Sequence, residues 1–296
     1  MADESALGAA VRLTIAMETA AALAAYVRVT TESIEVDPQV RSLLDGIANE
    51  VAYDADRIGP AGQSIVGMVR AFLRQATELV ENPTRIGDWE YVDEAILQGV
   101  GRLSMAITTA YQVAAQSLEG LGERLSAPGS TFLDVGTGSG WLAIATARAF
   151  PQLHVTGIDI FEPALRLARA NVEAEGLHDR VDVKVQNAVE LNGETTYDAI
   201  WLPLPFMPRA IVPQAIAASV AALRPGGWLL PGTFAGPDDR LSQMLVDLRT
   251  VRSGGHPWLP EEILDLLAAH GLDDVQEVHR TWAAPVRLYA GRRRTS

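Results

Sequence analysis

Apolar residues recur at three- and four-residue steps through residues 1–125, with polar residues between them. This spacing is typical of helices that bury one face. One such helix begins at Asp37-Pro38, where a residue that caps helix N-termini precedes a proline at the first helical position. The predicted apolar stripes cover residues 10–27, 40–51, 65–79 and 92–121. We therefore predict an all-helical N-terminal domain over residues 1–125.

The pattern changes from residue 126 onward, where short apolar runs of strand length alternate with stretches of helix length. This alternation predicts right-handed β-α-β units and a parallel sheet with helices on both faces. The last two strand-like runs, 275–280 and 286–291, are separated by a short turn, which predicts an antiparallel pair at the sheet edge. We therefore predict a Rossmann-like, doubly wound α/β domain over residues 126–296. Its sheet has seven strands, of which the last two are antiparallel.

A glycine-rich turn lies between the first predicted strand and its helix, in the sequence Asp134-Val-Gly-Thr-Gly-Ser-Gly140. Glycines at alternate positions allow a tight turn and a close approach to a ligand. The second predicted strand ends at Asp159, whose carboxylate can accept hydrogen bonds from both hydroxyls of a ribose. Trp141 occupies the position where a dinucleotide fingerprint has its third glycine. No Lys-Ser or Lys-Thr follows the turn, as a P-loop would require. These features disfavour an NAD-dependent oxidoreductase and a phosphate-binding P-loop.

Together, these residues resemble the class I S-adenosylmethionine-dependent methyltransferases, of the small-molecule type with an N-terminal helical domain. The resemblance extends over roughly residues 125–291 and includes Leu223-Arg-Pro-Gly-Gly-Trp228 before a late strand. It implies S-adenosyl-L-methionine as the methyl donor and S-adenosyl-L-homocysteine as the product. The cofactor residues that it implies are Asp134, Gly136, Thr137, Gly138 and Gly140 at the methionine end, Asp159 at the ribose, Ile160, Asn187 and Ala188 around the adenine, and Trp201 near the sulfonium.

The fourth predicted strand ends in a proline-rich rim, Pro203-Leu-Pro-Phe206, because proline cannot donate to a sheet ladder. Methyltransferases that act on amide or exocyclic amino nitrogens have a sequence similar to Asn/Asp-Pro-Pro-Tyr at this position. The rim lacks the carboxamide or carboxylate with which that sequence begins. Pro203 and Phe206 therefore favour a small hydrophobic or aromatic acceptor, methylated on O, N or an electron-rich carbon mainly through proximity and orientation. A protein or RNA acceptor is the alternative. Trp201 is either part of this rim or part of the core.

No general base stands out in the sequence. Glu18 and Tyr26 lie eight residues apart near one face of an apolar helix, and a buried glutamate is uncommon unless it is paired or functional. His256 either borders the pocket or is ordinary loop structure. Trp89 and Tyr91 either cover the acceptor or belong to a capped helix start. No pair of histidines has metal-ligand spacing, so we expect no metal.

The composition adds limits on partners and location. A net charge of −13 argues against a nucleic-acid partner, and the absence of cysteine excludes disulfides and thiolate metal sites. Arg, Glu or Thr interrupts the longest apolar runs before the ~20 residues of a membrane span, so we expect a cytoplasmic protein without a membrane contact. The apolar stripes of the helical half either pack within one chain or form a homodimer. A non-catalytic interaction protein with this fold is a further alternative.

Overall fold

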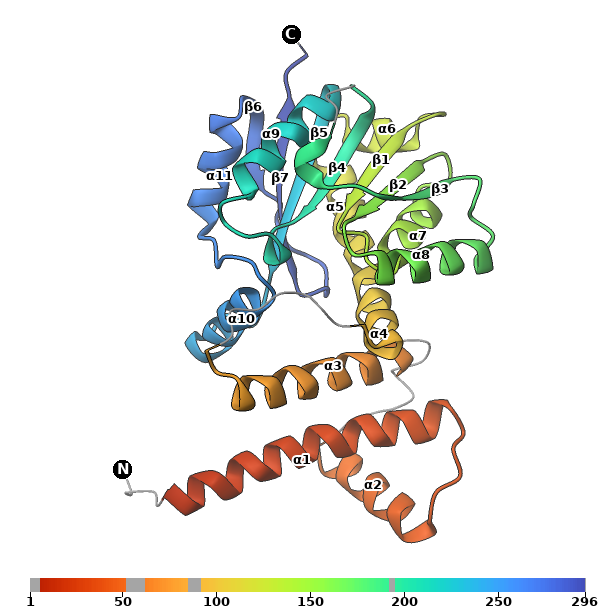
Figure 1. Ribbon diagram of the computed structural model, residues 1–296, viewed down its shortest axis with the longest axis vertical. Helices are drawn as coiled ribbons and strands as arrows, with labels where there is room; N and C mark the ends of the chain where they lie inside the picture. The colour runs from red at the N-terminus through yellow and green to blue at the C-terminus, as the bar shows by residue number, and fades with distance from the viewer. Residues whose placement is uncertain (1–5, 52–61, 85–91, 192–194, 296) are drawn as a thin grey trace. The chain divides into compact units, whose positions relative to one another are not determined.

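The computed structural model describes residues 6–51, 62–84, 92–191 and 195–295, and the chain divides into two compact units (Figure 1). The helical unit consists of Met1–Pro83 and Gln98–Leu103, and the sheet unit consists of Thr84–Leu97 and Ser104–Ser296.

This division differs from the boundary that we expected at residue 125. The helices α5 (Thr108–Ser117) and α6 (Leu121–Ser126) bury Tyr111, Leu121 and Leu125 in the core of the sheet unit. Their apolar stripe therefore faces the sheet, although its spacing alone could not distinguish them from the helices before them.

The helical unit contains α1 (Ala6–Thr31), α2 (Pro38–Glu50), α3 (Gly62–Glu81) and part of α4 (Glu94–Ser104). The predicted start of α2 is confirmed, since the Asp37 side chain accepts hydrogen bonds from two backbone N–H groups of the first turn. Two glycines set the packing of α3 against α4. A Cβ on Gly67 or on Gly99 would lie 2.4 Å from the Cα of the other, so these helices can approach this closely only without side chains there.

Helix α1 has an unusual surface for a helix of this length. Its residues Ala10–Thr31 are long and apolar enough to cross a membrane, by length and composition only, with a mean hydropathy of 1.4 and 6% of the tested window buried. Arg12, Glu18 and Arg28 interrupt the run but do not prevent it from meeting this test, so the expectation that every apolar run falls short of a membrane span is wrong for this helix. Signal sequences and core helices meet the same test, so it carries little weight about location.

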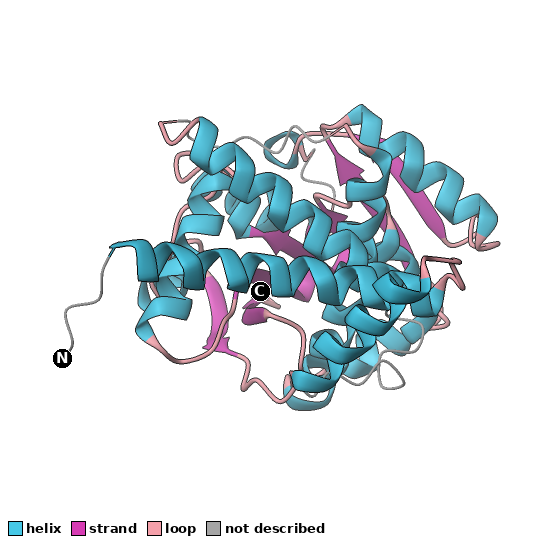
Figure 2. Ribbon diagram, turned by 90° about the horizontal axis from the view of Figure 1, so that it is seen from below, coloured by secondary structure: helices cyan, strands magenta, loops and turns pink. Residues whose placement is uncertain are grey.

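The sheet unit confirms the predicted fold. Its sheet has seven strands in the order β3-β2-β1-β4-β5-β7-β6, and helices lie on both sides of it (Figure 2). Strands β1 to β5 are mutually parallel, whereas β7 is antiparallel to both β5 and β6. The strands are β1 (Thr131–Val135), β2 (His154–Asp159), β3 (Val181–Val185), β4 (Tyr197–Pro203), β5 (Leu223–Phe234), β6 (Leu272–Glu277) and β7 (Val286–Arg293).

Two hydrophobic cores form because successive side chains of a strand point to opposite faces of the sheet. One core contains Phe132, Trp201 and Trp228, and the other contains Leu133, Ile200 and Leu229. The remaining helices of the unit are α7 (Trp141–Ala149), α8 (Glu162–Ala174), α9 (Val212–Ala222), α10 (Arg240–Arg252) and α11 (Pro260–Ala269). Because β1, β2 and β4 are adjacent and parallel, their carboxyl ends lie together at one end of the sheet, where open parallel sheets bind their ligands.

Candidate active site

The glycine-rich turn between β1 and α7 adopts the conformation that the sequence predicts. Gly136, Gly138 and Gly140 have φ angles of +66°, +55° and +81°, in the left-handed region that favours glycine. A Cβ on Gly136 would also lie 3.0 Å from Cγ of Pro203. The turn thus places backbone at the end of β1, in contact with the first proline of the rim.

Asp134 supports this turn from beneath. Its side chain is fully buried, and its Oδ2 accepts a hydrogen bond of 2.7 Å from the Thr137 hydroxyl. Its Oδ1 is also buried. Burial raises the pKa of Asp134 to about 7, against the smaller opposing effect of the bond from Thr137. In this geometry Asp134 shapes the turn through Thr137.

Asp159, at the end of β2, ties the turn to the neighbouring strand. Its Oδ2 accepts from the Gly138 N–H at 2.9 Å, and its Oδ1 accepts from the Phe161 N–H at 2.9 Å. Burial raises the pKa of Asp159, and these backbone hydrogen bonds oppose that shift. Each carboxylate oxygen can accept more than one hydrogen bond, so the group still has capacity for ribose hydroxyls. The next side chain, Ile160, is 70% exposed and offers an apolar surface beside it.

The segment after β3 matches the expectations for the adenine only in part. The Asn187 carboxamide oxygen accepts from the Val189 N–H at 3.2 Å and caps a short 3-10 helix, η4 (Ala188–Glu190). The oxygen that we expected to accept from an adenine amino group therefore already has a partner. Ala188 is buried, at 7% exposure. Asparagine favours such capping positions, because its side chain bonds the backbone two residues on.

The proline-rich rim forms the end of β4 and the 3-10 helix η5 (Leu204–Phe206). Phe206 is partly exposed and packs edge-on against Phe234 of β5, with ring centroids 5.6 Å apart. Trp201 is 4% exposed, and its ring covers Gly232 so closely that a Cβ there would lie 2.1 Å away. Trp201 therefore belongs to the core, as the second of the two alternatives expects, because strand alternation turns its ring toward Tyr111.

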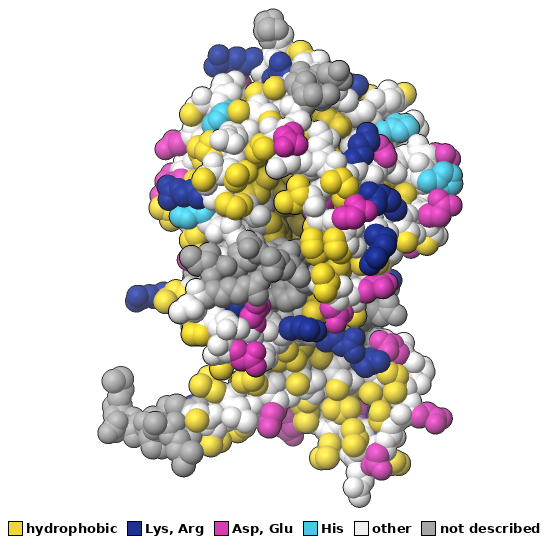
Figure 3. All heavy atoms as spheres, viewed as in Figure 1, with side chains coloured by type: hydrophobic (Ala, Val, Ile, Leu, Met, Phe, Trp, Pro, Cys, Tyr) yellow, Lys and Arg dark blue, Asp and Glu magenta, His cyan; other side chains and the backbone are white. Residues whose placement is uncertain are grey.

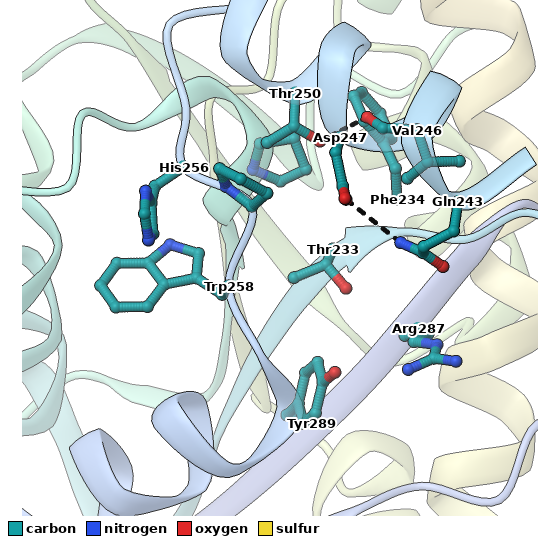
Figure 4. A pocket seen from close by; sticks show the side chains of 12 residues that line it. Thr233, Phe234, Gln243, Val246, Asp247, Thr250, His256, Trp258, Arg287 and Tyr289 are labelled. Carbon is teal, nitrogen blue, oxygen red and sulfur yellow. Dashed lines mark hydrogen bonds between the residues drawn. The ribbon is translucent and has the colours of Figure 1, made fainter. Parts of the chain in front are cut away.

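A pocket lies beside this rim and is drawn from close by in Figure 4. Rim and β5 contribute Pro205, Thr233 and Phe234; α10 contributes Gln243, Val246, Asp247 and Thr250; the loop after α10 contributes His256, Pro257 and Trp258; β7 contributes Arg287 and Tyr289. Aromatic rings and polar groups therefore share one concavity at the carboxyl end of β5. Burial raises the pKa of Tyr289, so its phenol is neutral near pH 7.

Comparison with known proteins connects this geometry to a family. A family model described as "Methyltransferase domain" matches residues 132–227, which span the glycine-rich turn, Asp159 and the rim. The match is to a methyltransferase domain over about a third of the chain. A solved O-methyltransferase family protein from Burkholderia thailandensis superposes with a TM-score of 0.69 at 17% identity, with 99% of each chain covered. Human N-acetylserotonin methyltransferase, solved in complex with SAM, superposes with a TM-score of 0.63 at 15% identity over the whole of both chains. These structures show the fold.

Curated relatives of the methyltransferase domain carry other names. A release factor glutamine methyltransferase of Rhodopirellula baltica is 33% identical over 132 residues, which cover 43% of this chain and 43% of that protein. A ribosomal protein uL3 glutamine methyltransferase of Bordetella pertussis is 37% identical over 98 residues, or 32% of this chain and 33% of that protein. The chain spans about half the length, or less, of the curated relatives it matches.

The structure separates the candidate bases. Glu18 is exposed on α1, so the argument from a buried glutamate does not apply to it, and Tyr26 is half-buried with the Arg41 guanidinium 5.9 Å from its ring centre. His256 lines the pocket beside the rim. Trp89 and Tyr91 lie outside the described residues. Within the described part of the chain, no three His, Cys, Asp or Glu side chains group as metal ligands.

Sequence reasoning missed several pocket residues, and it missed Arg209, which contacts His256 and Trp258 of the pocket lining. Arg209 is three positions beyond Phe206, which was the only sequence signal for it. Thr233, Asp247, Arg287 and Tyr289 come from elements far apart in the chain, and no motif connects them.

Proposed function

We propose that this chain transfers a methyl group from S-adenosylmethionine to a small hydrophobic or aromatic molecule. The observation that carries the proposal is the paired arrangement of the glycine-rich turn and Asp159, with an apolar rim in contact with that turn through Gly136 and Pro203. The solved O-methyltransferase family protein supports it, as does the structure of human N-acetylserotonin methyltransferase in complex with SAM.

The residues present fit this cofactor. The glycine-rich turn leaves open space over Gly138, where a Cβ would meet no atom within 4 Å, so backbone N–H groups at the α7 N-terminus can approach the methionine end. Asp159 would accept the ribose hydroxyls, and Ile160 would lie against the adenine. S-adenosylmethionine, when bound, supplies an electrophilic methyl group on a sulfonium.

The protein's part in the reaction is then mainly alignment. An in-line displacement gains much of its rate from holding the two reactants in position, with effective molarities of ~10⁵ M or more. Pro203 and Pro205 are buried and hold this segment rigid, since proline fixes its own φ, and the partly exposed Phe206 offers an apolar ring. No carboxamide or carboxylate on this rim could orient an amide nitrogen.

The test follows methyl-labelled S-adenosylmethionine in a lysate of the source cells, separated into small-molecule, protein and nucleic-acid fractions. We expect label in the organic-extractable fraction, and its loss in Asp159→Ala. The matched control is Asp182→Ala, an exposed aspartate on the neighbouring strand β3 that forms an ion pair with Lys184. Label confined to protein or RNA would overturn the small-molecule acceptor.

A protein acceptor is the second candidate, and one observation favours it. The curated relatives named glutamine methyltransferases of release factors and of ribosomal protein uL3 are 31–37% identical to parts of this chain. A peptide acceptor would place label in the protein fraction of the same experiment.

We further propose that the helical unit pairs two copies of the chain. Leu13 and Met17 of α1 and Leu43 of α2 are 68%, 59% and 68% exposed, and hydrophobic side chains gather on the surface of these helices that Figure 3 shows. Apolar surface of this kind marks an interaction site. Sedimentation at micromolar concentration that shows only monomer would exclude a dimer, and replacing Leu13 and Leu43 by Gln should produce that result.

A further inference from the structure

Arg209 connects three parts of the sheet unit that are separated in the sequence. It follows the rim, and its Nη1 lies 3.0 Å from Nε2 of His256. Its Nη2 donates to Oε1 of Glu262 in α11 at 3.2 Å, and its guanidinium carbon lies 5.2 Å from the ring centre of Trp258. One side chain thus connects the segment after β4 with the loop after α10 and with the first turn of α11.

The loop that Arg209 reaches, residues 254–258, is packed directly on the rim. A Cβ on Gly255 would lie 2.3 Å from the carbonyl oxygen of Pro205, so backbone meets backbone there. The rings of His256 and Trp258 pack edge-on, with centroids 4.9 Å apart. Because His256, Pro257 and Trp258 all line the pocket, this loop forms one of its walls (Figure 4).

The bond between Arg209 and His256 fixes the protonation state of the imidazole. An arginine side chain only donates hydrogen bonds, so Nε2 of His256 has to accept and must carry no proton. The ring is then neutral, with its proton on Nδ1. A proton on Nε2 would replace this hydrogen bond with two cations 3.0 Å apart. In this arrangement His256 is a hydrogen-bond donor through Nδ1 and cannot serve as a general base.

We propose that Arg209 is a positioning residue that holds the rim and the pocket wall together only while His256 is neutral. The proposal rests on the proposed function and adds a control on its acceptor side. Acid would release the loop, and the acceptor would lose one wall of its pocket.

The surroundings of His256 support this direction of control. Burial lowers the pKa of His256 below 6.5, the positive charge of Arg209 lowers it further, and Glu262 partly opposes both. The other ionisable side chains that line the pocket are Asp247 of α10 and Arg287 and Tyr289 of β7. Asp247 accepts a hydrogen bond from Gln243 at 3.1 Å, on the same helix.

The first test is an NMR titration of the full chain labelled with ¹⁵N-histidine. The His256 signals are identified by their loss in His256→Gln. We expect the neutral ring to carry its proton on Nδ1 and to titrate below 6.5, and Arg209→Gln to move the titration toward the ordinary value. A proton on Nε2 in the wild type, or the same titration in Arg209→Gln, would overturn the proposal.

The second test compares methyl transfer into the organic-extractable fraction at about pH 5.5 and about pH 7.5. We expect transfer by the wild type to fall several-fold in acid. His256→Gln should reduce this fall, because a carboxamide oxygen can accept from Arg209 and does not titrate. The matched control is His270→Gln, which removes a histidine bonded to the Leu266 carbonyl oxygen and should fall like the wild type.

Binding of S-adenosylhomocysteine, measured by calorimetry at both pH values, separates the two proposals. No binding to the wild type would remove the proposed function itself. Binding that is equal in wild type and Arg209→Gln, together with weaker transfer by the variant at neutral pH, supports the positioning role. Binding and transfer that are both unchanged in Arg209→Gln would remove the positioning role alone.

Discussion

The two sides of the candidate active site are built in different ways. The donor side, around the glycine-rich turn, comes from residues 134–140 and from Asp159, and its contacts are short hydrogen bonds within adjacent strand–helix units. The acceptor side is assembled from the rim, α10, the loop 254–258 and β7, which are far apart in the chain. A local motif therefore fixes the donor side, whereas only the tertiary fold brings the acceptor side together.

This difference implies different sensitivities to mutation and pH. On the donor side, glycines at positive φ leave little freedom for substitution, and burial raises the pKa of both Asp134 and Asp159. On the acceptor side, partly exposed side chains such as Phe206 and Arg209 each make contacts of modest strength with their own neighbours. The predictions below test this contrast, beginning with the largest expected effect.

The largest effect concerns the buried carboxylate of Asp134. Burial raises its pKa to about 7, so the folded state holds a proton there that the unfolded chain releases near its ordinary value of 3.8. The free energy of unfolding should therefore fall as pH rises from about 4 to about 7 and level off above that. Asp134→Asn removes this charge, and at about pH 8 it should be more stable than the wild type by up to about 4 kcal/mol.

Urea unfolding at several pH values measures this effect. Asp182→Asn, an exposed change on β3, is the matched control and should leave the wild-type slope intact. If Asp134→Asn keeps the same pH slope as the wild type, another group carries it.

The second effect is on donor binding. Asp159→Ala removes the acceptor of two backbone N–H bonds and the expected acceptor of the ribose hydroxyls. Hydrogen bonds to charged groups contribute about 1.5–3 kcal/mol each, so the affinity for S-adenosylhomocysteine should fall by about 100-fold. Calorimetry measures it, with Asp182→Ala as the control. An affinity within about threefold of the wild type would place the ribose elsewhere.

How much of each side was predictable follows from the same contrast. Gly136, Gly138, Gly140 and Asp159 were predictable because their residue types and spacing carry the geometry: a positive φ needs glycine, and a strand end presents a carboxylate. The fold was predictable for a similar reason, since helix and strand periods differ. The domain boundary was not, because α5 has the same helical period as its predecessors yet packs on the sheet.

The acceptor side shows where such reasoning stops. Trp201 lies within a strand that the sequence predicts, but only the pairing of β4 with β1 and β5 shows that its ring enters the core and covers Gly232. Asn187 was expected at the adenine, and only the structure shows that its carboxamide oxygen also caps η4. Arg209 is an ordinary loop arginine in the sequence, and its three partners come from positions 256–262. Contacts of high sequence separation leave no local signal.

The third effect separates two glycines of the turn. Gly140→Ala would bring a Cβ within 3.0 Å of the Ala168 Cβ and 3.2 Å of the Ala168 Cα, at a φ of +81°. Gly138→Ala has a φ of +55° but no atom within 4 Å of the new Cβ. We expect a loss of about 2–3 kcal/mol in unfolding free energy for Gly140→Ala and about 1 kcal/mol for Gly138→Ala. Equal losses would mean that φ alone decides.

The smallest effect is on the acceptor side. Phe206 and Phe234 pack edge-on at 5.6 Å, and such aromatic pairs contribute about 0.5–1.5 kcal/mol beyond the area they bury. Because Phe206 is 37% exposed, Phe206→Leu should cost about 1 kcal/mol of stability and leave the affinity for S-adenosylhomocysteine unchanged. A double-mutant cycle with Phe234→Leu measures the coupling between the rings. Coupling near zero would show that the rim is fixed by its prolines and by Arg209 alone, whereas loss of donor affinity in Phe206→Leu would show that the two sides are not independent.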